Sequence, residues 1–168
     1  MATSKIYVLP ETAIWFTPAT ATNNDYDLGV HSLGAGAGRQ SARHDFGVSA
    51  RARRFTWRAF CQFATTPVLD ETVDIYYKGS DGAHPDNDDG TGDAAVSSIN
   101  KLKNLPYLGS ILVDEAAANI EMVQSGEIEL SHRYVQFVFW NATADGLTSD
   151  VNENGLLLIP VPDQGQAT

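Results

Sequence analysis

The sequence predicts an all-β protein with about eight to ten strands, arranged as a sandwich or a barrel. Three observations support this fold class. Short runs rich in β-branched and aromatic residues recur at even spacing between turn residues. One run alternates between apolar and polar positions over its whole length, and helical periodicity is weak elsewhere. The chain has 168 residues, which is the usual size of one domain.

The clearest strand covers residues 54–64. One of its faces carries Phe55, Trp57, Ala59, Cys61 and Phe63. The other face carries Thr56, Arg58, Phe60 and Gln62. This period-two alternation is expected of a sheet with one buried face.

Other runs complete the strand set. Residues 72–78 also alternate, with Tyr76 and Tyr77 on opposite faces. Residues 134–140 are apolar on both faces, which predicts a central strand. The remaining expected strands are residues 5–9, 12–17, 26–33, 108–113, 127–131 and 156–161, and the central strand as a whole spans residues 133–141.

Helix signals predict one or two short helices. Asp93 is a suitable N-cap for a helix that runs to Asn104. Residues 114–125, which precede Gly126, form a second candidate. The alternating glycines of residues 33–39 predict a flexible loop, and residues 79–93 form a long acidic loop.

We expect one domain over residues 1–168. Residues 1–9 either pair within this domain or act as an arm or swapped strand, and residues 162–168 form a flexible tail. Composition predicts a soluble protein made in the cytoplasm, because we find neither a signal peptide nor an apolar run that could span a membrane. The single cysteine, Cys61, leaves no partner for an intrachain disulfide.

Charge is unevenly distributed. The net charge is −10, yet residues 39–58 carry +5 because six arginines are opposed only by Asp45. The rest of the chain therefore carries −15. The arginines either contact an acidic protein partner or neutralise the protein's own acidic loops. Nucleic acid is the least favoured partner, because most of the molecule would repel phosphate.

Catalytic and metal signatures are lacking. Cys61 falls on the apolar face of its strand and is expected to be an inert core residue. The four histidines lie in separate segments without zinc-ligand spacing. The loop around Asp86 is rich in carboxylates but fails the EF-hand pattern, which leaves a solvated acidic loop or a weak cation site. We therefore predict no enzyme activity, no metal and no cofactor.

Aromatic residues raise a carbohydrate-binding alternative. Trp15, Trp57 and Trp140 are candidates for a sugar platform, although Trp57 and Trp140 occupy positions typical of a core. Within this alternative, the residues expected to bind glycan are Tyr76, Tyr77 and Asp86.

Six segments carry a resemblance to a known family: residues 8–14, 32–39, 55–60, 81–93, 134–143 and 158–163. Together they resemble small structural proteins of tailed bacteriophages that are encoded near capsid genes. Within that class, the chain is most similar to capsid decoration (cement) proteins. The resemblance implies a jelly-roll-like antiparallel β-sandwich that forms dimers or trimers on the outer capsid surface. It implies no catalytic residues and no cofactor.

We therefore expect a non-enzymatic virion protein that bridges neighbouring major capsid proteins and stabilises the capsid. The residues expected to contact the partner are Arg39, Arg43, Arg51, Arg53 and Arg54. Neither nucleic acid nor membrane is an expected partner. Two alternatives stay open: a glycan- or receptor-binding module of a head or tail fibre, and a tail or connector subunit.

Overall fold

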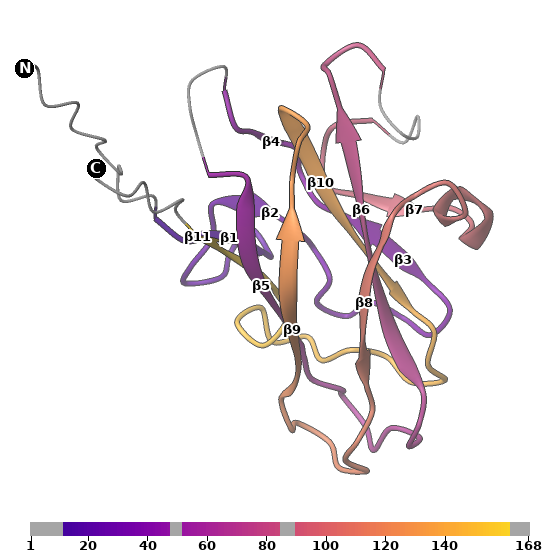
Figure 1. The fold of residues 1–168 in the computed structure, drawn as a ribbon. Coiled ribbons are helices and arrows are strands. Elements are labelled where there is room, and N and C mark those ends of the chain that lie inside the picture. The colour runs from indigo at the N-terminus through magenta and orange to yellow at the C-terminus, as the bar shows by residue number, and fades with distance from the viewer. Residues whose placement is uncertain (1–11, 48–51, 85–89, 162–168) are drawn as a thin grey trace, which may run out of the picture.

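The computed structural model describes residues 12–47, 52–84 and 90–161. This part of the chain forms two β-sheets packed face to face (Figure 1). The strands are β1 (Ile14–Thr17), β2 (Tyr26–Asp27), β3 (Gly38–Gln40), β4 (His44–Asp45), β5 (Arg54–Cys61), β6 (Thr72–Ser80), β7 (Ala94–Val96), β8 (Tyr107–Leu112), β9 (Met122–Glu129), β10 (Tyr134–Asn141) and β11 (Gly155–Val161). One 3₁₀ helix, η1 (Ile99–Leu102), lies between β7 and β8.

The strand order is that of a jelly roll. The first sheet runs β2-β1-β11-β5-β9 and the second runs β7-β3-β10-β6-β8, with β4 pairing the start of β10. The eight principal strands form nested antiparallel pairs, in which β1 pairs with β11, β3 with β10, β5 with β9 and β6 with β8. The predicted all-β, jelly-roll-like sandwich is therefore confirmed. One edge differs from a fully antiparallel sandwich, because β2 runs parallel to β1.

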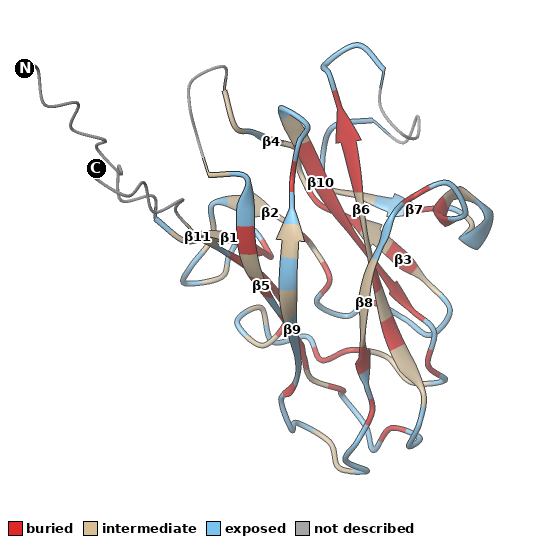
Figure 2. Cartoon of the chain, in the orientation of Figure 1, coloured by how far each residue is buried: buried red, intermediate tan, exposed pale blue. Residues whose placement is uncertain are grey.

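The core lies between the two sheets and follows the predicted alternation of β5. Phe55, Trp57, Ala59, Cys61 and Phe63 are all buried, whereas Arg58 on the other face is exposed. Strand β10 is central in its sheet and buried along nearly its whole length, as Figure 2 shows. Its inward side chains join the main core, and its outward side chains join a second apolar cluster.

Trp57 closes one open side of the sandwich. Its indole lies against Gly109 of β8 and Gly126 of β9, which belong to different sheets. A Cβ at Gly109 would lie 2.9 Å from the ring, and a Cβ at Gly126 would lie 3.0 Å from it. Both positions therefore need glycine so that the indole can fill the gap between the sheet edges.

Both helix predictions are wrong in extent. Instead of a helix from Asp93 to Asn104, the chain forms β7 on the edge of β3 and then a single 3₁₀ turn capped by the Ser98 hydroxyl. Residues 114–121 are irregular and Met122 begins β9, so the second expected helix is absent from this described stretch. Strand pairing with neighbours outweighs these weak local helical signals.

One strand prediction and one loop prediction also differ from the structure. Of the expected strand at residues 26–33, only Tyr26 and Asp27 pair. The glycine loop ends earlier than expected, because Gly38 begins β3 beneath the Trp140 ring. The expected strand at residues 5–9, the arm at residues 1–9, the tail at residues 162–168, Arg51 and Asp86 lie outside the described residues.

Candidate functional site

Arg39 forms an ion pair within the protein. Its Nε and Nη2 donate to the two carboxylate oxygens of Asp93, at 2.6 Å and 2.5 Å. The same carboxylate accepts from the backbone N–H of Gly29 at 3.0 Å. The hydrogen bonds that Arg39 donates to Asp93 raise the pKa of Arg39. Arg39 therefore joins β3 to the segment before β7, and its guanidinium is already occupied.

Two further arginines pair across the first sheet. Arg54 lies 3.2 Å from Glu127, and Arg58 lies 2.9 Å from Glu121. These side chains are 40–70 % exposed, so the pairs contribute little to stability. Arg53 is exposed and has no ion pair with another described residue.

Arg43 is held in a different way. Its guanidinium carbon lies 4.2 Å from the centroid of the Tyr134 ring, and that of Arg133 lies 4.8 Å from the same ring. Arg133 is anchored by Asp45, with contacts of 2.7 Å and 2.8 Å, and these bonds lower the pKa of Asp45 to about 2. Arg43 has no ion pair with another described residue. The aromatic ring therefore orients its charge, and a guanidinium held in this way suits an anion.

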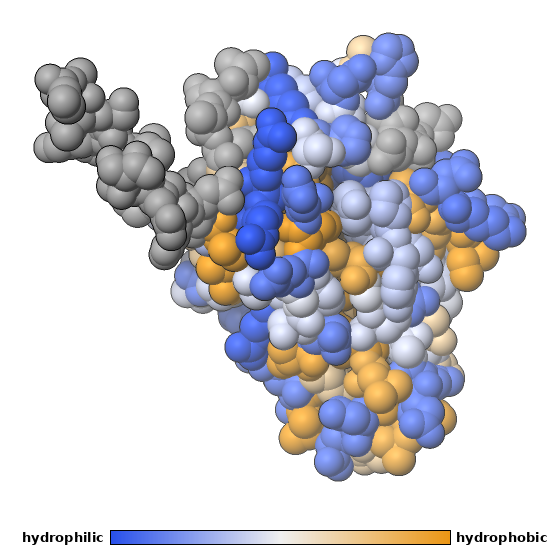
Figure 3. Space-filling model, viewed as in Figure 1, coloured by the Kyte–Doolittle hydropathy of each residue, from blue (hydrophilic) through white to orange (hydrophobic). Residues whose placement is uncertain are grey.

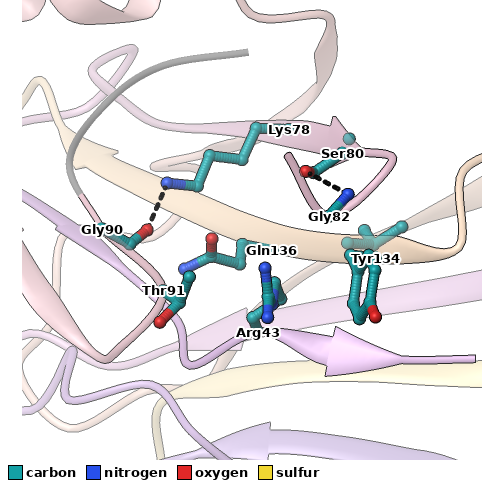
Figure 4. Close-up of a pocket in the computed structure, with 10 residues that line it drawn as sticks. Arg43, Lys78, Ser80, Gly82, Gly90, Thr91, Tyr134 and Gln136 are labelled. Atoms are coloured by element: carbon teal, nitrogen blue, oxygen red, sulfur yellow. Dashed lines mark hydrogen bonds between the residues drawn. The ribbon is translucent and has the colours of Figure 1, made fainter. Parts of the chain in front are cut away.

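This arginine lines a pocket of about 250 Å³ on the outer side of the second sheet (Figure 4). Figure 4 shows Arg43 between Thr91 and Tyr134, and Lys78 reaching towards Gly90. Lys78 is only 2 % exposed, and its ammonium donates to Gln40 Oε1 at 2.9 Å and to the Gly90 carbonyl at 3.1 Å. The Arg43 guanidinium in this pocket suits a carboxylate, whereas the Lys78 ammonium is already engaged by hydrogen bonds within the protein.

The arginine end is the loop end of the sandwich where β5 and β10 begin, and it carries Arg43, Arg53 and Arg133. The opposite loop end, here called the acidic end, consists of residues 28–37, 62–71, 113–121 and 142–154. It holds eight carboxylates and no lysine or arginine. Figure 3 shows apolar side chains among the polar ones where the loops after β5 and β8 meet, and Val68, Leu69 and Ile120 are exposed there. The arginine end also carries Asp45, and Asp81 follows β6 there, so its cations stand among carboxylates, whereas the acidic end has carboxylates and no lysine or arginine.

The glycan residues expected from sequence do not form one platform. Tyr76 packs on the outer face of its sheet against Tyr107, with ring centroids 5.4 Å apart, whereas Tyr77 packs on the main core. Burial raises the pKa of Cys61 to about 12, consistent with an inert core thiol. Among the described residues, no group of three or more His, Cys, Asp or Glu side chains is placed to hold a metal ion.

Sequence reasoning missed Tyr134 as the support of Arg43. The signal was weak, because Arg43 and Tyr134 are distant in sequence and meet only when β4 pairs with the start of β10. No family model matches the chain, and no curated protein matches it. Among the described residues, no helix is long and apolar enough to cross a membrane.

Proposed function

We propose that this chain is a non-enzymatic structural protein of a bacteriophage particle. In this role it decorates the outer capsid surface and bridges neighbouring major capsid proteins. The proposal rests on the resemblance of the sequence to such proteins, and it includes assembly into a dimer or trimer. The observation that supports it best is Arg43 at the arginine end, which is oriented by Tyr134 and has no ion pair with another described residue.

The fold supports this proposal by analogy. Jelly rolls with nested strand pairs recur in viral capsid proteins and in lectins. The fold alone does not define a function, because function resides in specific sites on the fold.

Arg43 supplies such a site. Stacking on Tyr134 removes much of the conformational freedom that an exposed arginine would lose on binding. A carboxylate of a partner protein can then form two parallel hydrogen bonds with the guanidinium. Arg53 lies at the same end of the sandwich and is exposed, so it adds a second cation to the contact. Arg39 and Arg54 contribute less, because each already pairs with a carboxylate.

An acidic end without lysine or arginine favours one orientation over the other. The arginine end faces the shell, and the acidic end, with its eight carboxylates, faces away from it. An oligomer that places several arginine ends on one shell turns weak single contacts into strong attachment. Bridging neighbouring coat proteins then raises the free energy needed to separate them.

The test is co-sedimentation with capsids assembled from the major capsid protein of the genome that encodes this chain. Arg43→Ala is expected to weaken binding by roughly tenfold or more, the loss of one charged hydrogen-bonded contact. Lys103→Ala removes the same charge from an exposed site near η1 and serves as the matched control. Equal binding by wild type, Arg43→Ala and the Arg43→Ala/Arg53→Ala double variant at physiological salt would contradict the assignment.

A further inference from the structure

The outer face of the first sheet contains a groove that the proposed function does not use. Two adjoining hollows, of about 170 Å³ and 280 Å³, share Trp15, Asn23, Phe60 and Asn152. The residues that line both are described, and they come from β1, β5 and two loops. The pocket around Arg43 lies on the other sheet, so the two sites are separate.

Strand register builds the floor of this groove. Trp15, Leu157 and Arg58 stand in one row across β1, β11 and β5. In the next row, Phe60 lies opposite Gly155, where a Cβ would come within 3.2 Å of the phenyl ring and 2.7 Å of the Phe16 carbonyl. Glycine at this position lets the Phe60 ring lie close to the sheet backbone, which keeps the groove open.

The aromatic side chains differ in exposure. Phe60 is 7 % exposed and forms the floor, while Trp15 is half-buried and forms a wall. A half-buried tryptophan offers both an apolar ring face and an indole N–H donor. Such a wall suits a ligand with an apolar ring face and polar edges.

Polar groups stand at both ends of the groove. At one end, Arg58 and Glu121 form a 2.9 Å ion pair that leaves further donors and an acceptor oxygen exposed. At the other end, Asn152 accepts from the Thr22 backbone N–H at 2.8 Å, which leaves its amide N–H groups without a partner among the described residues. The Asn23 side chain is exposed and also has no hydrogen bond to a described residue.

We infer that this groove binds a neutral saccharide. A sugar ring presents C–H groups on its face and hydroxyls around its edge, which matches an aromatic wall flanked by amides and a charged pair. Asp25 and Asp150 accept hydrogen bonds from the backbone N–H groups of Trp15 and Asn152, and Glu153 follows Asn152 in the chain, so an acidic sugar would be repelled. The volume fits one sugar unit, which makes millimolar affinity the expected range.

The experiment is a titration of the full chain with methyl glucoside, methyl galactoside and N-acetylglucosamine, followed by NMR and tryptophan fluorescence. Saturable binding is expected for at least one sugar, with Trp15→Ala weakening it by roughly tenfold or more and Trp15→Phe retaining part of it. Tyr107→Ala is the matched control, because Tyr107 is a 56 % exposed aromatic residue of the other sheet. Each variant must keep the wild-type unfolding midpoint to within a few degrees.

Two results would overturn the inference. One is the absence of saturable binding to all three sugars. The other is binding that survives Trp15→Ala, or that is lost equally in Tyr107→Ala. Capsid attachment through Arg43 is measured separately, so failure of one proposal does not imply failure of the other.

Discussion

The outer faces of the two sheets differ in how far other segments of the chain cover them. On the second sheet, Val138 and Trp140 are buried beneath Val96, Leu102 and Leu105 from the segment that contains β7 and η1. On the first sheet, Val123 and Ile159 remain 41 % exposed, and no described segment covers Trp15 to the same extent. One face therefore adds a second small core to the fold, and the other keeps its aromatic side chain available for binding.

Trp140→Ala is expected to have the largest effect on the free energy of unfolding. Trp140 is 9 % exposed and packs across Gly38, so its removal leaves a cavity beneath the covering segment. The free energy of unfolding should fall by about 3 kcal/mol, measured by denaturant titration. Trp15→Ala, the same substitution on the uncovered face, should cost about 1 kcal/mol. Equal losses in the two variants would show that both faces stabilise the fold alike.

Arg39→Ala gives an intermediate effect. The Arg39–Asp93 pair ties the covering segment to β3, and its side chains are 31 % and 19 % exposed. Because the pair is only partly shielded, the expected loss of unfolding free energy is about 1–2 kcal/mol. Arg54→Ala removes the exposed pair with Glu127 on the first sheet and should cost less than about 0.5 kcal/mol. A larger loss for Arg54→Ala than for Arg39→Ala would reverse this ranking.

The smallest effect concerns the Asp45 carboxylate near the Arg43 pocket. Hydrogen bonds from Arg133 lower its pKa to about 2. The stabilisation of the fold by these hydrogen bonds is therefore present in full when the pH is above the pKa of Asp45 in the unfolded chain, about 3.9. It is lost as the pH falls through the folded pKa of about 2. An NMR titration of the Asp45 carboxyl should show this pKa, and Arg133→Ala should return it towards the ordinary value. An unchanged pKa in Arg133→Ala would contradict the anchored arrangement around Tyr134.

The strands with strong alternation could be predicted from sequence, and so could the fold class. Trp57 and Trp140 were assigned to core positions, and both are buried. The extent of the helix expected from Asp93 could not be predicted, because pairing between β7 and β3 decides it. Local signals do not report such long-range pairing.

The site residues were harder to predict. That Arg39 forms an ion pair with Asp93, whereas Arg43 stacks on Tyr134, depends on contacts between residues that are distant in the chain. The groove at Trp15 depends on the register of three strands, β1, β11 and β5, which sequence spacing does not reveal. Residue types could therefore be chosen from sequence, but their partners could not.

The most direct test of the central proposal is to image capsids that lack this protein after incubation with the purified chain. The proposal predicts regular density on the outer shell at symmetry axes, with the end that carries Arg43 and Arg53 facing the coat protein. Co-sedimentation of the same sample gives the stoichiometry. Shells that remain bare while the protein stays folded would contradict a capsid-decorating role.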